Sequence, residues 1–176
     1  MAIVLGARFV RYGLIAGGLL VAEGSGHADD AIFPPVTSHV LGNLHAADQK
    51  EIQAGEIAQK DGQSKAVKDY GKMLVKDHTA AEKNVADLAT KERVDLQAST
   101  PAIGPNDMGT MASGRGFDKA FAQEMLDDHR KAIAAVTEAL NNTVDPQLRK
   151  LLTDLLPTLQ KHEAAAEKII DAEANK

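Results

Sequence analysis

The stretch from Val67 to Leu88 reads VKDYGKMLVKDHTAAEKNVADL, and its apolar side chains recur at spacings of three and four residues. This spacing places them on one face of an α-helix, and such a face is buried against other helices. The stretch therefore predicts a long helix whose inward face carries one histidine. The residues on this face are Val67, Tyr70, Leu74, His78, Ala81, Val85 and Leu88.

The residues before this stretch predict a second helix that pairs with it. Thr37 and Ser38 are good N-caps, so we expect a helix to begin after them and to continue to about Lys60. The segment Asp61-Gly62 ends it, and the helix containing the quoted stretch begins after Ser64. The connection is short, as in a helical hairpin.

Two more helices are predicted towards the C-terminus. One begins at Phe117 and ends at residues 141–143, and the other begins with Asp145 as N-cap and Pro146 in its first turn. Pro157 lies inside the last helix and is expected to kink or split it. Their inward faces carry Phe121, Met125, His129, Ile133, Val136 and Leu140 in the first helix, and Leu148, Leu152, Leu155, Leu159, His162, Ala166 and Ile169 in the second.

The connections predict how these helices are joined. Residues 95–116 contain two prolines and four glycines and interrupt the helical pattern, whereas the other two connections are short. Two helical hairpins joined by a long crossover are typical of a ferritin-like bundle. Aromatic residues make up only 3% of the chain, which suits an aliphatic helical core better than a sheet. We therefore expect an all-α, ferritin-like antiparallel four-helix bundle.

Residues 1–28 have the pattern of a secretory signal peptide. Arg8 and Arg11 precede a short apolar run at residues 14–22, and small residues lead to a predicted cleavage site after Ala28. The apolar run is about half of the roughly 20 residues that a membrane-spanning helix needs. The predicted domain organisation is a signal peptide at 1–28, a flexible lead at 29–36 and the four-helix bundle at 37–176.

These features predict an exported protein of the periplasm with no transmembrane segment in the mature chain. The net charge of −5 is interspersed along the sequence, so no basic face indicates nucleic-acid binding. There is no cysteine, which excludes thiolate ligands and cysteine nucleophiles. No nucleophile turn or phosphate-binding loop is present, and no catalytic residue is predicted.

Three histidines, His78, His129 and His162, lie near the midpoints of the inward faces of three helices. Residues at the midpoints of antiparallel helices come to one level, so we expect the three side chains to approach one another. Asp48 and Glu51 lie near the midpoint of the first helix at inward-compatible positions. Three imidazoles with a carboxylate suit Zn, Cu or Fe. The predicted metal ligands are Glu51, His78, His129 and His162.

The alternative interpretation is structural. A hydrogen-bonded network of histidines, carboxylates and Tyr70 can tie four helices together and satisfy each buried polar group without a metal. A ferritin-type di-iron centre is disfavoured because it needs Glu-x-x-His on two helices, and no glutamate stands three residues before a histidine.

The sequence resembles a bacterial family, domain-of-unknown-function family 4142, whose members are ferritin-like exported proteins often labelled predicted outer membrane proteins. The resemblance extends over residues 37–172 and implies a ferritin-like four-helix fold in the periplasm or peripheral at the outer membrane, while leaving the activity unassigned. The residues that carry it are Glu51–Ala58, Val67–Thr79, Phe117-Asp118, Asp128-His129, Leu156-Pro157 and His162.

Three functional hypotheses remain open. The first is a non-enzymatic periplasmic bundle that acts in envelope maintenance or stress tolerance, with its Glu/His cluster either fixing the packing or binding a metal. The second is a metal-binding or storage module of the ferritin-like type. The third is a helical interaction protein that binds an envelope partner.

Overall fold

The fold is described from a computed structural model, which describes residues 35–99 and 114–175. In this part of the chain the structure consists of helices and their connections, without a strand. This confirms the predicted all-α four-helix bundle; the ferritin-like assignment stays a prediction. The elements are α1 (Pro35–Asp61), α2 (Lys65–Lys91), α3 (Leu96–Ser99), the 3₁₀-helix η1 (Gly114–Gly116), α4 (Phe117–Asn142) and α5 (Pro146–Ala174).

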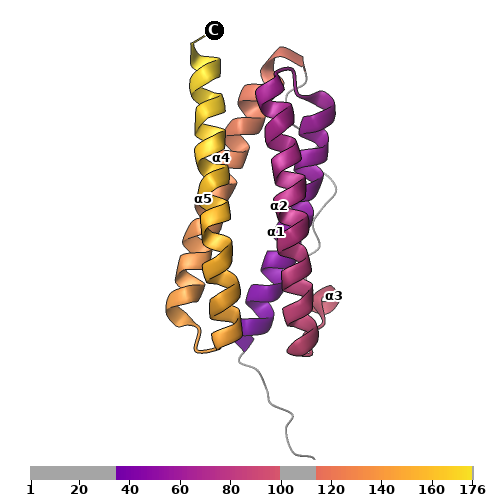
Figure 1. Cartoon of the computed structure of the whole chain (residues 1–176), viewed down its shortest axis with the longest axis vertical. Helices are drawn as coiled ribbons and strands as arrows, with labels where there is room; N and C mark the ends of the chain where they lie inside the picture. Colours follow the sequence, from indigo (N-terminus) through magenta and orange to yellow (C-terminus); the bar gives the residue numbers. More distant parts are fainter. Residues whose placement is uncertain (1–34, 100–113, 176) are drawn as a thin grey trace, which may run out of the picture. The chain divides into compact units, whose positions relative to one another are not determined.

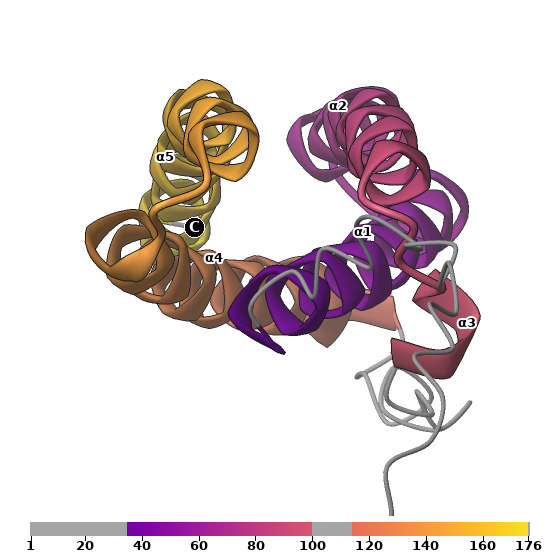
Figure 2. The same cartoon turned by 90° about the horizontal axis from the view of Figure 1, so that it is seen from below.

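The four long helices form two antiparallel hairpins, α1–α2 and α4–α5 (Figure 1). The view along the bundle in Figure 2 shows the two hairpins side by side. The main contact between them is that of α2 with α5, whereas α1 and α4 touch only sparsely. None of the helices in the described ranges combines the length and apolarity needed to cross a membrane.

Glycines allow α1 and α2 to pack closely. A Cβ atom added at Gly55 would lie 2.6 Å from the carbonyl oxygen of Gly71, and one added at Gly71 would lie 2.6 Å from the carbonyl oxygen of Gly55. Both distances are well inside van der Waals contact, and the clashing atoms belong to the backbone. The hairpin therefore depends on the absence of side chains at these two positions.

Asp118, at the start of α4, connects the two hairpins. Its Oδ1 accepts a hydrogen bond from the backbone N–H of Gln63 (2.8 Å), and its Oδ2 accepts one from Ser64 (2.7 Å). Both donors lie in the turn between α1 and α2, where Ser64 also caps α2 by accepting from the backbone N–H of Val67. A single buried carboxylate thus holds the turn of one hairpin against the first turn of the other.

The helix boundaries differ from the sequence-based expectations in three places. α1 already begins at Pro35, because proline is compatible with the first turn of a helix, where its missing N–H has no partner. α3 forms a short turn of helix inside the predicted break at residues 95–116. Pro157 does not split α5, which continues from Pro146 to Ala174. Pro157 is exposed, so the helix carbonyl that it leaves without a partner can face water.

A polar layer divides the core into two apolar clusters. The first cluster is centred on Leu74, Phe121 and Met125, and the second on Leu41, Val85 and Leu152. Between them along the helices lie buried polar side chains, so the bundle is apolar towards both ends and polar in the middle. The members of this layer are Asp48, Glu51, His78, His129 and His162.

The close approach of α1 and α2 predicts the effect of Gly71→Ala. Helix propensity alone favours alanine by about 1 kcal/mol. The backbone clash acts in the opposite direction, and overpacking of this kind costs about 1–3 kcal/mol. We expect Gly71→Ala to lower the free energy of unfolding in urea denaturation, with the exposed neighbour substitution Lys72→Ala as control. A stabilised Gly71→Ala variant would show that the helices can separate at little cost.

Candidate metal centre

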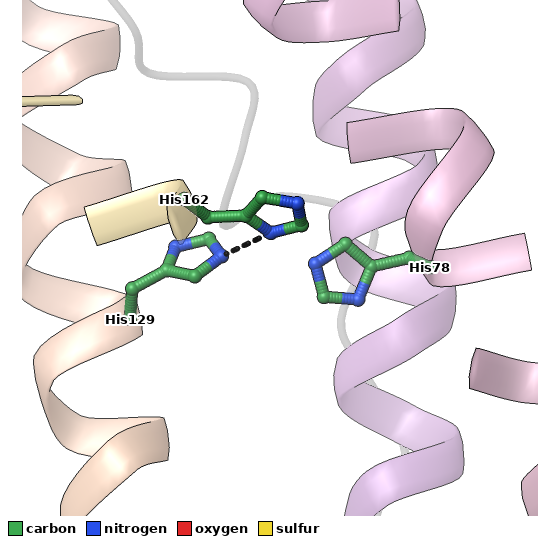
Figure 3. Close-up of side chains that lie close together, drawn as sticks. All are labelled: His78, His129 and His162. Carbon is green, nitrogen blue, oxygen red and sulfur yellow. Dashed lines mark hydrogen bonds between the residues drawn. The ribbon is translucent and has the colours of Figure 1, made fainter. Parts of the chain in front are cut away.

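The three histidines of the polar layer come together from three helices. His78 of α2, His129 of α4 and His162 of α5 are at most 3% exposed. One ring nitrogen from each lies within 4.8 Å of the other two. Figure 3 shows the three rings pointing toward one another, with a close contact between His129 and His162. The sequence-based expectation that these residues approach one another agrees with this geometry.

Each ring also has a nitrogen that faces away from the centre and meets an oxygen atom. His129 Nδ1 lies 2.8 Å from the backbone carbonyl oxygen of Met125. His162 Nε2 lies 3.1 Å from Asp77 Oδ2, and His78 Nδ1 lies 2.8 Å from Asp48 Oδ1. A carbonyl oxygen and an ionised carboxylate only accept hydrogen bonds, so the imidazole nitrogens must be the donors.

These outward hydrogen bonds determine what faces the centre. A neutral imidazole has one N–H and one lone pair, so a ring that donates outward presents its lone pair inward. The inward atoms are His78 Nε2, His129 Nε2 and His162 Nδ1. Burial lowers the pKa of both His129 and His162 to about 4, which keeps these two rings neutral at pH 7. The inward nitrogens of the three rings thus converge on one point, where they can act as ligand atoms.

The contact between His129 and His162 brings two ring nitrogens close together. His129 Nε2 and His162 Nδ1 are 3.1 Å apart, which is hydrogen-bond distance. With both outward nitrogens protonated, neither inward nitrogen has a proton to share, and two lone pairs face each other. The third inward atom, His78 Nε2, is buried and has no hydrogen-bond partner among the described residues. A metal ion bound between the three nitrogens would satisfy all of them.

Two carboxylates of α1 belong to the same layer. Asp48 orients His78, while Glu51 makes no hydrogen bond through its buried Oε2 in the described part of the protein. Burial raises the pKa of Glu51 to about 7 and also raises the pKa of Asp48. Glu51, the predicted fourth ligand, lines the same cavity as His78 and His129. Its carboxylate does not belong to the cluster of three ring nitrogens that lie within 4.8 Å of one another.

The roles of Asp77 and Asp48 in orienting the rings were not predicted. Asp77 precedes His78 in the sequence, and neighbouring residues on a helix do not face one another. Asp77 instead reaches across to His162 of α5, and it also binds Lys161 at 2.8 Å. The sequence feature that could have indicated this role is the position of Asp77 three residues after Leu74, at the edge of the buried face of α2.

Comparison with known proteins gives the family. A family model described as Domain of unknown function (DUF4142) matches residues 22–169, which is well over half of the chain, and the protein therefore belongs to this family. No curated protein and no solved structure matches the chain.

The buried histidines predict how stability depends on pH in the metal-free protein. The pKa of His129 and His162 falls from 6.5 to about 4 on folding, so between these values the unfolded chain binds up to two more protons. The free energy of unfolding therefore falls as the pH is lowered from about 6.5 to about 4. Glu51 acts in the opposite direction, because its pKa rises from 4.5 to about 7 and the folded state holds the extra proton. The raised pKa of Asp48 acts in the same direction as Glu51.

We expect the two imidazoles to outweigh the carboxyl groups, which gives a net loss of a few kcal/mol on acidification. The Glu51→Gln variant removes one opposing group and should lose stability more steeply. Urea denaturation at a series of pH values, with a chelator present, measures both slopes. Flat profiles for both proteins would mean that the rings are not buried as neutral groups.

Proposed function

We propose that this protein of the DUF4142 family is a non-enzymatic metal-binding bundle of the cell envelope, with His78, His129 and His162 as its metal ligands. The observation that carries the proposal is the convergence of three buried imidazole nitrogens from three helices within 4.8 Å, each ring being oriented by an oxygen behind it. Metal-binding histidines usually donate their second N–H to a carboxylate or a backbone carbonyl in this way.

The rival interpretation, a hydrogen-bonded network that only fixes the packing, explains less of this geometry. A network stabilises a core when every buried polar atom has a partner, and a half-satisfied network costs stability. Here His78 Nε2 has no partner in the described ranges, and His129 Nε2 faces another lone pair. The nitrogens that face outward all meet an oxygen, whereas the inward His78 Nε2 has no partner in the described residues, which is the pattern expected of ligands.

The donor set favours a transition metal of the borderline type. Neutral imidazoles suit Zn²⁺, Cu²⁺ and Fe²⁺, and the protein has no thiolate to compete for them. The carboxylates of Asp48 and Asp77 lie behind two of the rings and supply two negative charges that balance a divalent ion. Glu51 remains the predicted fourth ligand, since its buried Oε2 faces no other partner in the described structure.

Location and physiological role follow from the sequence and belong to the same proposal. Residues 1–28 act as an export signal that lies outside the described residues, and the bundle works in the periplasm or peripherally at the outer membrane. A metal-binding bundle there would take part in metal storage, envelope maintenance or stress tolerance. The alternative of a helix face that binds an envelope protein has less support, because Val144 is the one large hydrophobic side chain exposed among the described residues.

Metal titration of the purified protein, prepared without a histidine tag, tests the proposal. We expect one Zn²⁺, Cu²⁺ or Fe²⁺ per chain by elemental analysis, and a melting temperature that rises with metal, because binding to the native state stabilises it. The double substitution His78→Ala/His129→Ala should abolish binding. The matched control is His39→Ala, which changes an exposed histidine of α1. If wild type and control bind no metal and the double variant is merely less stable, the histidines are core structure.

The oxygens behind the rings give a second prediction. Asp77→Asn removes the charge that orients His162, and such changes typically weaken metal affinity by about 10–100-fold. The matched control is Asp69→Asn on the same helix, which alters an exposed carboxylate that binds Lys65 and Lys72. Competition with a chromophoric chelator measures both affinities. Equal affinities would mean that Asp77 serves only its ion pair with Lys161.

A further inference from the structure

A cavity of about 600 Å³ lies between α1 and α4, where the two helices touch only sparsely. Its size falls in the range of about 300–1,000 Å³ that is typical of small-molecule sites. Most of its lining is apolar, and it leads to the polar layer. The main apolar lining residues are Val40, Leu44, Val136, Leu152, Leu155 and Leu159.

The polar end of this cavity contains two buried carboxylates. Asp48 is 3% exposed and Glu51 is 7% exposed, and both line the cavity. Asp48 Oδ2 and Glu51 Oε2 are buried and have no hydrogen-bond partner among the described residues. Buried carboxylate oxygens without partners are costly, so a donor that reaches these two oxygens would be bound favourably.

The cations that line the cavity do not fulfil this role. Lys50 Nζ binds Asp128 Oδ2 at 2.7 Å, and Lys131 Nζ lies 3.4 Å from Asp128 Oδ1. The histidine centre does not do so either. A metal ion on the three imidazoles accounts for His78 Nε2, but not for Asp48 Oδ2, since His78 contacts the other oxygen of this carboxylate. An occupant that donates hydrogen bonds and carries positive charge would complement these two carboxylates.

We propose that the cavity between α1 and α4 binds an aliphatic primary amine, with its ammonium group between Asp48 and Glu51 and its hydrocarbon chain along the apolar walls. A primary ammonium has three N–H donors and no acceptor, which matches the unpartnered carboxylate oxygens of Asp48 and Glu51. Its charge complements the two carboxylates, and its chain removes the leucine and valine side chains from water. The amine site shares Glu51 with the proposed metal site, where it is the predicted fourth ligand, but it needs neither the three imidazoles nor a metal ion.

Isothermal titration of the chelator-treated protein with octylamine tests the inference. At pH 8 the amine is charged, as a lysine side chain would be. We expect one octylammonium ion to bind per chain, whereas octanol and octanoate, which have the same chain with other head groups, bind at least about tenfold more weakly. Ethylamine, which keeps the head group and lacks the chain, should show no binding at the same concentration.

Two matched variants locate the head group. Glu51→Gln breaks no hydrogen bond of its carboxylate in the described structure and should weaken octylammonium binding about tenfold or more. Glu138→Gln makes the same chemical change at an exposed position that lines the cavity and should leave binding unaltered. Equal binding of octylamine, octanol and octanoate to wild type, no binding of octylamine, or equal effects of the two variants would each overturn the proposal. Amine binding is measured on the chelator-treated protein and metal binding is measured without amine, so the two proposals fail independently.

Discussion

The polar layer rests on one constraint: burial keeps His129 and His162 neutral, and a neutral imidazole can donate only one hydrogen bond. His78, His129 and His162 each use that N–H on an oxygen behind the ring, so their lone pairs converge. The orientation of each ring is thus fixed by a hydrogen-bond acceptor. For His78 and His162 this acceptor is a carboxylate on another helix, and for His129 it is a backbone carbonyl one turn earlier in α4. A cation is the species that this arrangement of lone pairs can hold.

The packing of the helices supports this geometry. Gly55 and Gly71 bring α1 against α2, and this pairing places Asp48 next to His78. α5 is held against α2 near His162, whose backbone carbonyl accepts a hydrogen bond from the Tyr70 hydroxyl at 3.1 Å. The buried carboxylate of Asp118 holds the two hairpins together at the turn between α1 and α2, so a motif that the sequence marked only as a family feature has a structural role.

A polar layer in a core reduces stability, and the bundle offsets this with apolar clusters on both sides of it. The layer also has two chemically different parts. The nitrogens face one another between α2, α4 and α5, whereas the unpartnered oxygens of Asp48 and Glu51 lie along α1, beside the cavity where α1 and α4 separate. The proposed metal site uses the first part and the proposed amine site uses the second.

The sequence by itself determined the helices, their pairing into hairpins and the level at which the three histidines meet, because helical periodicity and short connections are local properties of the chain. It could not show the tautomers of the rings, since Asp77 serves a histidine that is 85 residues away in the chain and not the one beside it. Nor could it show that α1 and α4 leave a cavity or that Glu51 keeps an unpartnered oxygen there. These features depend on distances between helices, which only the packing of all the side chains decides.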